Sequence, residues 1–106
     1  MKEQIIDKTA HALLAAAPAG TQVILFGSHA RGLARPDSDL DFLVVEPEVN
    51  NRFDEILRLR KVIAHALGDT IQPVDLMVTD AARFRSRSTV PNTLAHEAAT
   101  YGRLYE

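Results

Sequence analysis

Two carboxylates separated by one residue, Asp39 and Asp41, are the first candidates for chemistry in this chain. They open an apolar run, Phe42 to Val45, that predicts a buried strand. On a strand the side chains of residues i and i+2 project from the same face, so the two carboxylates should lie side by side. Like charges this close repel unless one takes a proton or a cation bridges them, and hard oxygen ligands suit Mg²⁺ or Mn²⁺. Considered alone, such a pair is more often the polar end of an ordinary strand.

A glycine–serine pair, Gly27-Ser28, follows another apolar run, Val23 to Phe26. A strand that ends in glycine and is followed by serine exposes backbone N–H groups and a hydroxyl, which together can bind an anion. Glycine matters there because a Cβ would hold the backbone away from a phosphate oxygen. Alone, Ser28 is typical of a helix N-cap. Arg31, which places a cation one helical turn further on, is alone typical of a solvated surface.

A third carboxylate, Asp75, lies within the apolar segment Val74 to Val78. A buried unpaired charge is costly, so this side chain must be exposed, paired or bound to a metal. Strand alternation places Leu76 and Val78 opposite to Asp75 and Met77, but it leaves open which face is buried. Three carboxylates on adjacent strands could hold two divalent ions about 4 Å apart, the arrangement used in two-metal phosphoryl transfer.

The elements that must position these residues follow from the apolar spacing and the capping residues. Helices are expected over residues 3–17, 52–67, 80–87 and 91–101, and strands over residues 23–26, 39–46, 74–78 and 103–105. Asn51 and Gly68 should cap the second helix, Thr79 or Asp80 the third, and Pro91 should open the last. The second helix should bury a face made of Phe53, Ile56, Leu57, Ile63 and Leu67. Helices alternating with strands predict an α/β or α+β fold with one small sheet.

The chain of 106 residues, 46% hydrophobic and 25% charged, predicts a single globular domain over residues 1–106. A net charge of −2 provides no basic field, so direct binding of nucleic acid is not expected. The absence of cysteine excludes disulfides and Cys-based zinc sites. The apolar stretch at residues 12–17 is too short to cross a membrane and does not form a signal peptide, so we expect a cytoplasmic protein.

Taken together, the segments at residues 27–32, Gly-Ser-His-Ala-Arg-Gly, and 38–41, Ser-Asp-Leu-Asp, resemble the GSxxRG…SDxD signature of polymerase-β-type nucleotidyltransferases. The small size and the near-complete coverage of the chain resemble the minimal nucleotidyltransferases, the MNT antitoxins of HEPN/MNT toxin–antitoxin pairs. His29 stands where relatives often have arginine, and this departure leaves the acids intact. The resemblance implies a polymerase-β-like palm: a small mixed sheet flanked by helices.

The resemblance also implies a role for each acid. Asp39 and Asp41 would bind two Mg²⁺ ions, for which Mn²⁺ could substitute. Asp75 would bind the catalytic ion and help to deprotonate the acceptor hydroxyl. The reaction implied is transfer of AMP from ATP to a tyrosine hydroxyl of a cognate HEPN ribonuclease toxin, which silences the toxin within a hetero-oligomer.

The nucleotide would be held by the residues around the glycine–serine pair. Gly27 and Ser28 would bind the β- and γ-phosphates, and Arg31 together with Gly32 would support that turn or the phosphates. Ser38 would orient the acidic pair.

Two other functions remain open from the sequence. The chain could be an antitoxin that blocks its toxin sterically and keeps the acids as a vestige. It could also be a nucleotidyltransferase acting on a small molecule, which would need an acceptor pocket that so short a chain has little room to build.

Overall fold

The computed structural model describes residues 2–106. Its elements are, in chain order, α1 (Lys2–Ala16), β1 (Gln22–Phe26), β2 (Leu40–Glu46), α2 (Arg52–Leu67), β3 (Val74–Asp80), α3 (Ala81–Arg87), α4 (Leu94–Tyr101) and β4 (Arg103–Tyr105). Each helix and strand expected from the sequence is present, and the predicted α+β class with a small mixed sheet is confirmed.

The four strands form one sheet in the order β3-β2-β1-β4. β1 runs antiparallel to β2 and to β4, whereas β2 and β3 run parallel and are joined through α2. A parallel pair needs such a crossover, because its strands cannot be connected by a tight turn. The amino ends of β2 and β3 therefore lie at the same edge of the sheet, next to the end of β1.

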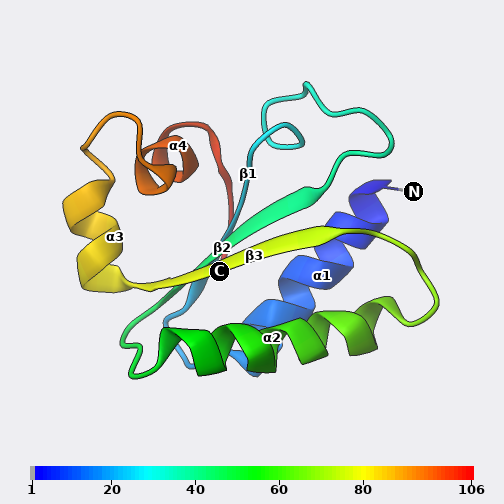
Figure 1. The fold of residues 1–106 in the computed structure, drawn as a ribbon, viewed down its shortest axis with the longest axis horizontal. Helices are drawn as coiled ribbons and strands as arrows, with labels where there is room; N and C mark the ends of the chain where they lie inside the picture. The colour runs from blue at the N-terminus through cyan, green and yellow to red at the C-terminus, as the bar shows by residue number, and fades with distance from the viewer. Residues whose placement is uncertain (1) are drawn as a thin grey trace.

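Helices cover both faces of the sheet (Figure 1). α1 and α2 cover one face over the larger core, and α3 and α4 pack on the other, where Ala98 joins the strand residues Ile24, Leu43 and Val45. β1 and β2 are buried on both faces, which explains why their sequences are nearly continuous apolar runs. No helix within residues 2–106 is both long enough and apolar enough to cross a membrane.

The buried face of α2 differs from the predicted one. Leu59 and Ile63 are its buried residues, whereas Phe53 and Leu57, which were expected in the core, are 68% and 45% exposed. Positions 56, 59, 63 and 67 follow the helical repeat toward the sheet, and positions 53 and 57 fall outside that stripe.

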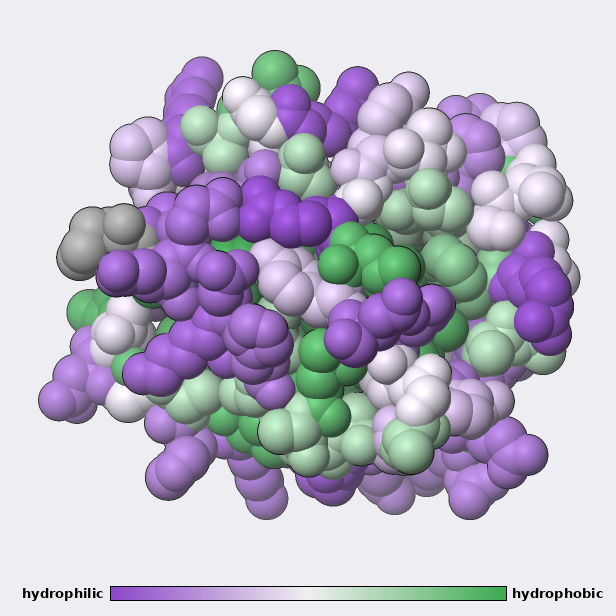
Figure 2. All heavy atoms as spheres, turned by 180° about the vertical axis from the view of Figure 1, so that it is seen from behind, coloured by the Kyte–Doolittle hydropathy of each residue, from purple (hydrophilic) through white to green (hydrophobic). Residues whose placement is uncertain are grey.

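The face seen from behind Figure 1 shows hydrophobic side chains in separate patches among hydrophilic ones (Figure 2). Such separate patches are common on protein surfaces.

The caps of the helices define the loops near the site. The side chains of Asn51 and Asp80 accept hydrogen bonds from backbone N–H groups in the first turns of α2 and α3, as predicted for Asn51 and as one of two alternatives for Asp80. The predicted start of the last helix at Pro91 is wrong, since α4 begins at Leu94 with Thr93 as its N-cap. Pro91 and Asn92 instead form a turn, in which Asn92 has a positive φ of 66°. Proline followed by asparagine is a favoured pair for such a turn.

Candidate active site

Two of the three predicted acids lie side by side at the edge where β2 and β3 begin. Asp41 and Asp75 are register partners in the parallel pair, and strand alternation places both on the face that carries α3 and α4. Asp41 is half-buried and Asp75 is exposed on the edge strand. This arrangement decides the question that alternation left open: Leu76 and Val78 face the core, and Asp75 faces away from it.

The environment of Asp41 is strongly anionic. Burial raises the pKa of its carboxyl above the usual value, and the negative charges of Asp75, Asp39 and Glu97 raise this pKa further. Asp39 itself is exposed and precedes the first residue of β2. The structure therefore brings Asp41 and Asp75 together. Asp39 lies outside the strand pair, but its negative charge still acts on Asp41.

The three acids do not by themselves form a closed metal cage. Within residues 2–106, no group of three or more histidine, cysteine or acidic side chains is arranged to hold one ion. Mg²⁺ ordinarily keeps several waters and is bound by one or two carboxylates together with substrate phosphates. Burial raises the pKa of Asp41, and the repulsion of the neighbouring carboxylates raises it further; a divalent ion would relieve that repulsion. The residues thus fit a divalent cation that a nucleotide brings or completes.

Gly27 places the end of β1 against Asp41. Phe26 is the register partner of Asp41, and Gly27 follows it with a positive φ of 74°. A Cβ at position 27 would overlap Oδ2 of Asp41, so any side chain there would displace this carboxylate. The need for glycine predicted from phosphate binding therefore has a second physical reason, which is the packing of the acidic residue.

The segment after Gly27 forms a hydrogen-bonded turn. The N–H of Arg31 donates to the carbonyl of Gly27 at 3.2 Å, and the N–H of Leu33 donates to the carbonyl of Ser28 at 2.9 Å. Gly32 has a positive φ of 73° and closes the turn. The guanidinium of Arg31 lies 4.3 Å from the centre of the Tyr101 ring, which connects this turn to α4.

Ser38 forms hydrogen bonds with the backbone and the side chains around it. Its hydroxyl accepts a hydrogen bond from the N–H of Arg35 at 2.9 Å, and its carbonyl accepts one from Nε2 of Gln72 at 3.2 Å. Nε2 of His29 lies 3.2 Å from the same carbonyl. The loop that leads into β2 is therefore held by hydrogen bonds on both sides.

Glu97 is a neighbour of the site that the sequence did not reveal. Its Oε2 accepts a hydrogen bond from the N–H of Gly27 at 3.1 Å, and its charge acts on Asp41. An acidic residue in the first turn of a helix is a common partner of the helix dipole, so nothing in the sequence distinguishes Glu97 from a surface residue.

A cavity of about 510 Å³ adjoins Glu97, and we refer to it as the α4 cavity. Its lining residues come from the end of β1, the loop before α4, and α4 itself: Phe26, Pro91, Asn92, Thr93, Leu94, His96, Glu97 and Tyr101. It adjoins the glycine–serine turn, because Phe26 precedes Gly27 in the chain and Glu97 accepts the hydrogen bond of the Gly27 N–H.

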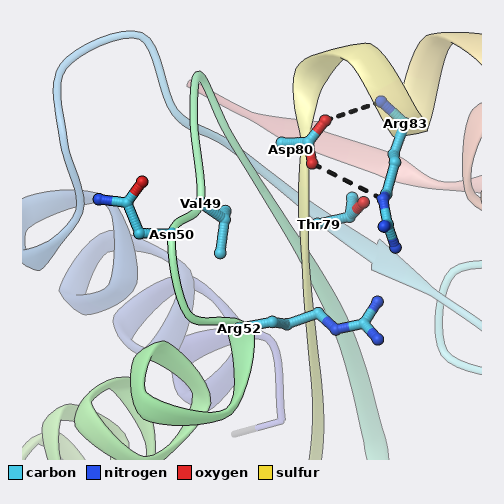
Figure 3. A pocket seen from close by; sticks show the side chains of 6 residues that line it. All are labelled: Val49, Asn50, Arg52, Thr79, Asp80 and Arg83. Carbon is cyan, nitrogen blue, oxygen red and sulfur yellow. Dashed lines mark hydrogen bonds and ion pairs between the residues drawn. The ribbon is translucent and has the colours of Figure 1, made fainter.

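A different hollow, of about 210 Å³, lies at the opposite end of β3 (Figure 3). Arg52 and Arg83 extend toward it from α2 and α3, and Asp80 pairs with Arg83. Its one carboxylate is thus engaged in capping α3, so it lacks the paired acids that the chemistry of a metal-bound nucleotide requires.

A profile of the family described as "Nucleotidyltransferase domain" matches residues 6–96, a range that includes the glycine–serine turn and all three acids. The chain belongs to this nucleotidyltransferase family. The predicted polymerase-β-like fold class is thereby confirmed, together with the coarse activity that the family name states.

Two solved structures resemble this nucleotidyltransferase domain. The first is a crystal structure of a toxin–antitoxin with AMP-PNP, with 28% sequence identity and a TM-score of 0.64. The match spans 92% of the present chain and 69% of the chain in that structure. The second is described as a candidate nucleotidyltransferase from Sulfolobus solfataricus, with 24% sequence identity and a TM-score of 0.59. The match spans 78% of the present chain and 70% of the chain in that structure. The second likeness concerns the fold alone, whereas the first agrees with the MNT-like relationship expected from the sequence. Among curated proteins, none matches this chain.

Proposed function

We propose that this nucleotidyltransferase is an antitoxin that transfers AMP from ATP to a tyrosine hydroxyl of a cognate HEPN ribonuclease toxin. The observation that carries the catalytic part is the register pairing of Asp41 with Asp75 beside Gly27. Paired carboxylates next to a glycine–serine turn suit the transfer of a nucleotidyl group, which depends on positioning and on neutralisation of charge.

The residues divide the reaction between them. Gly27 and Ser28 hold the β- and γ-phosphates, and Asp39 and Asp41 bind Mg²⁺. The bound metal would polarise the phosphates and stabilise the charge of the leaving pyrophosphate. The tyrosine oxygen attacks the α-phosphorus, the bond to the bridging oxygen of the β-phosphate breaks, and Asp75 takes the proton of the hydroxyl.

The openness of the site supports a macromolecular acceptor. Asp75 lies exposed on the edge strand β3, so a hydroxyl on the surface of another protein can approach it. The likeness to a toxin–antitoxin structure that contains AMP-PNP supports both a toxin as partner and a nucleotide as substrate.

Transfer of label from ATP tests this proposal. The chain is incubated with a candidate toxin of the HEPN class, with ATP labelled at the α-phosphate and with Mg²⁺, and the modified residue is then found by mass spectrometry. We expect a labelled tyrosine on the partner with the wild type and with Asp69→Asn, an exposed acid in the loop after α2. We expect at least about a 100-fold loss of rate with Asp41→Asn, because two metal contacts disappear.

The same experiment separates catalysis from steric neutralisation. If Asp41→Asn protects RNA from the toxin as well as the wild type does, while no label is transferred, the chain is a binding antitoxin and the catalytic proposal is wrong.

A further inference from the structure

The α4 cavity lies directly beside the turn proposed to hold the phosphates. Phe26 in its wall precedes Gly27 in the chain, and Glu97 in its wall accepts the hydrogen bond of the Gly27 N–H. A nucleotide with its phosphates at Gly27 and Ser28 therefore has this cavity within reach of its sugar and base. The volume of about 510 Å³ falls within the range of about 300–1,000 Å³ that is usual for small-molecule sites.

The wall of the cavity offers aromatic surface. Phe26 and His96 are half-buried, and Tyr101 is 50% exposed. Arg31 covers one face of the Tyr101 ring at 4.3 Å, so a base can stack only on the opposite face of this ring. Planar bases stack on such rings with little dependence on their identity.

The polar groups of the cavity can pair with the sugar and the base of a nucleotide. The carboxylate of Glu97 has one oxygen on Gly27, and its other oxygen can accept a hydrogen bond from a ribose hydroxyl. Asn92 is exposed in the loop before α4, and a carboxamide can both donate to and accept from the edge of adenine.

We propose that the α4 cavity binds the nucleoside of the nucleotide substrate, with its base stacked on Tyr101 and its edge contacted by Asn92. This inference rests on the proposed function, because it assumes that the glycine–serine turn holds the phosphates. It assigns residues of this chain to nucleotide selection that lie outside the glycine–serine and acidic motifs.

Binding of two probes tests the aromatic contact. Titration calorimetry measures the Kd of Mg-ATP and of Mg-tripolyphosphate, which carries the phosphates without a nucleoside. We expect Tyr101→Leu to weaken Mg-ATP by about tenfold or more and to change the Kd of Mg-tripolyphosphate less than twofold, because only the stacking contact is lost. Phe53→Leu is the matched control, since Phe53 is an exposed aromatic residue on α2, on the opposite face of the sheet, and should leave both Kd values unchanged.

The alternative results have distinct meanings. If Tyr101→Leu weakens both probes equally, the ring acts through Arg31 on the phosphates and the inference is wrong. If it changes neither Kd, the nucleoside lies elsewhere and the cavity is left for another group, such as the acceptor side chain. If the wild type binds no Mg-ATP at all, the proposed function itself fails together with the inference.

A second variant tests the edge contact without endangering the fold. Asn92→Gly suits the positive φ of this position and removes the carboxamide. We expect the wild type to bind Mg-ATP more tightly than Mg-GTP. In the variant, the ratio of the two Kd values should lie closer to one. An unchanged ratio of the two Kd values would remove Asn92 from the proposed site.

Discussion

At the scale of single residues, Gly27 is the position on which the site depends most closely. Gly27→Ala should reduce the free energy of unfolding by more than Gly32→Ala does, because both positions have φ near +74° but only position 27 lacks space for a Cβ. The shared backbone strain should cost about 1–2 kcal/mol in each variant. Chemical denaturation measures the difference, and equal losses would show that the contact with Asp41 carries no strain.

Asp75 provides a second prediction at this scale. Burial raises the pKa of Asp41, and the charge of Asp75 raises it further. A raised pKa means that stability is greatest while the proton is bound and is lost as the pH rises through that pKa. Asp75→Asn should therefore raise the Tm of the metal-free protein by a few degrees at pH 7, and much less at pH 3, while transfer of AMP is lost.

Thermal unfolding at the two pH values, with Asp69→Asn as an exposed acidic control, checks the prediction for Asp75. If Asp75→Asn instead lowers the Tm at pH 7, the carboxylates of Asp41 and Asp75 are already stabilised without a metal.

At the scale of elements, the contact between the end of β2 and α2 contains a buried acid outside the site. Glu46 is 3% exposed, and its Oε2 has no hydrogen-bond partner. Burial, together with the neighbouring Glu55, raises the pKa of Glu46 to about 7. Glu55 instead forms a pair with Arg58 at 2.7 Å, which lowers the pKa of its carboxyl.

The folded chain binds the proton of Glu46 more tightly than the unfolded chain does, and it loses this proton as the pH rises through about 7. The free energy of unfolding should therefore decrease as the pH rises from about 4.5, the ordinary pKa of glutamate, through about 7. Glu46→Gln should therefore stabilise the protein by about 1–3 kcal/mol at pH 8 and have little effect at pH 4.5. Urea unfolding across this range measures the effect, and parallel curves for the two proteins would contradict it.

Much of the arrangement of elements could be predicted from the sequence. Strands buried on both faces give continuous apolar runs such as Val23 to Phe26, and capping residues such as Asn51 mark the helix ends. The face of α2 could not be chosen correctly, because Phe53 and Leu57 fit a helical stripe nearly as well as Leu59 and Ile63 do. Only packing against the sheet distinguishes the two stripes.

The candidate site was less predictable than the fold. The acids and the glycine–serine turn are visible in the sequence because they form two spaced motifs within one local segment, and Asp75 stands out in an apolar strand. Glu97 and Tyr101 lie some 70 residues from the turn that they contact, through Gly27 and Arg31 respectively. Neither residue carries a local pattern, so their roles depend on the packing of α4 beside β1.

At the scale of the whole molecule, nucleotide and metal should stabilise the fold together. The carboxylates around Asp41 repel one another, and we expect a metal ion completed by phosphate oxygens to relieve this repulsion best. Ligand at about 100 times its Kd should add about 2.7 kcal/mol to the free energy of unfolding. The Tm with Mg²⁺ and AMP-PNP should thus exceed that with either alone by several degrees, and identical melting curves would contradict a joint site.

The central claim is that the acids and the glycine–serine turn form one nucleotide site. A crystal structure of the chain with AMP-PNP and Mn²⁺, whose position anomalous scattering reveals, tests it most directly. We expect a metal ion bound by Asp41 and completed by phosphate oxygens, with the terminal phosphates at Gly27 and Ser28. A nucleotide bound elsewhere, or Mn²⁺ away from Asp41, would contradict the account.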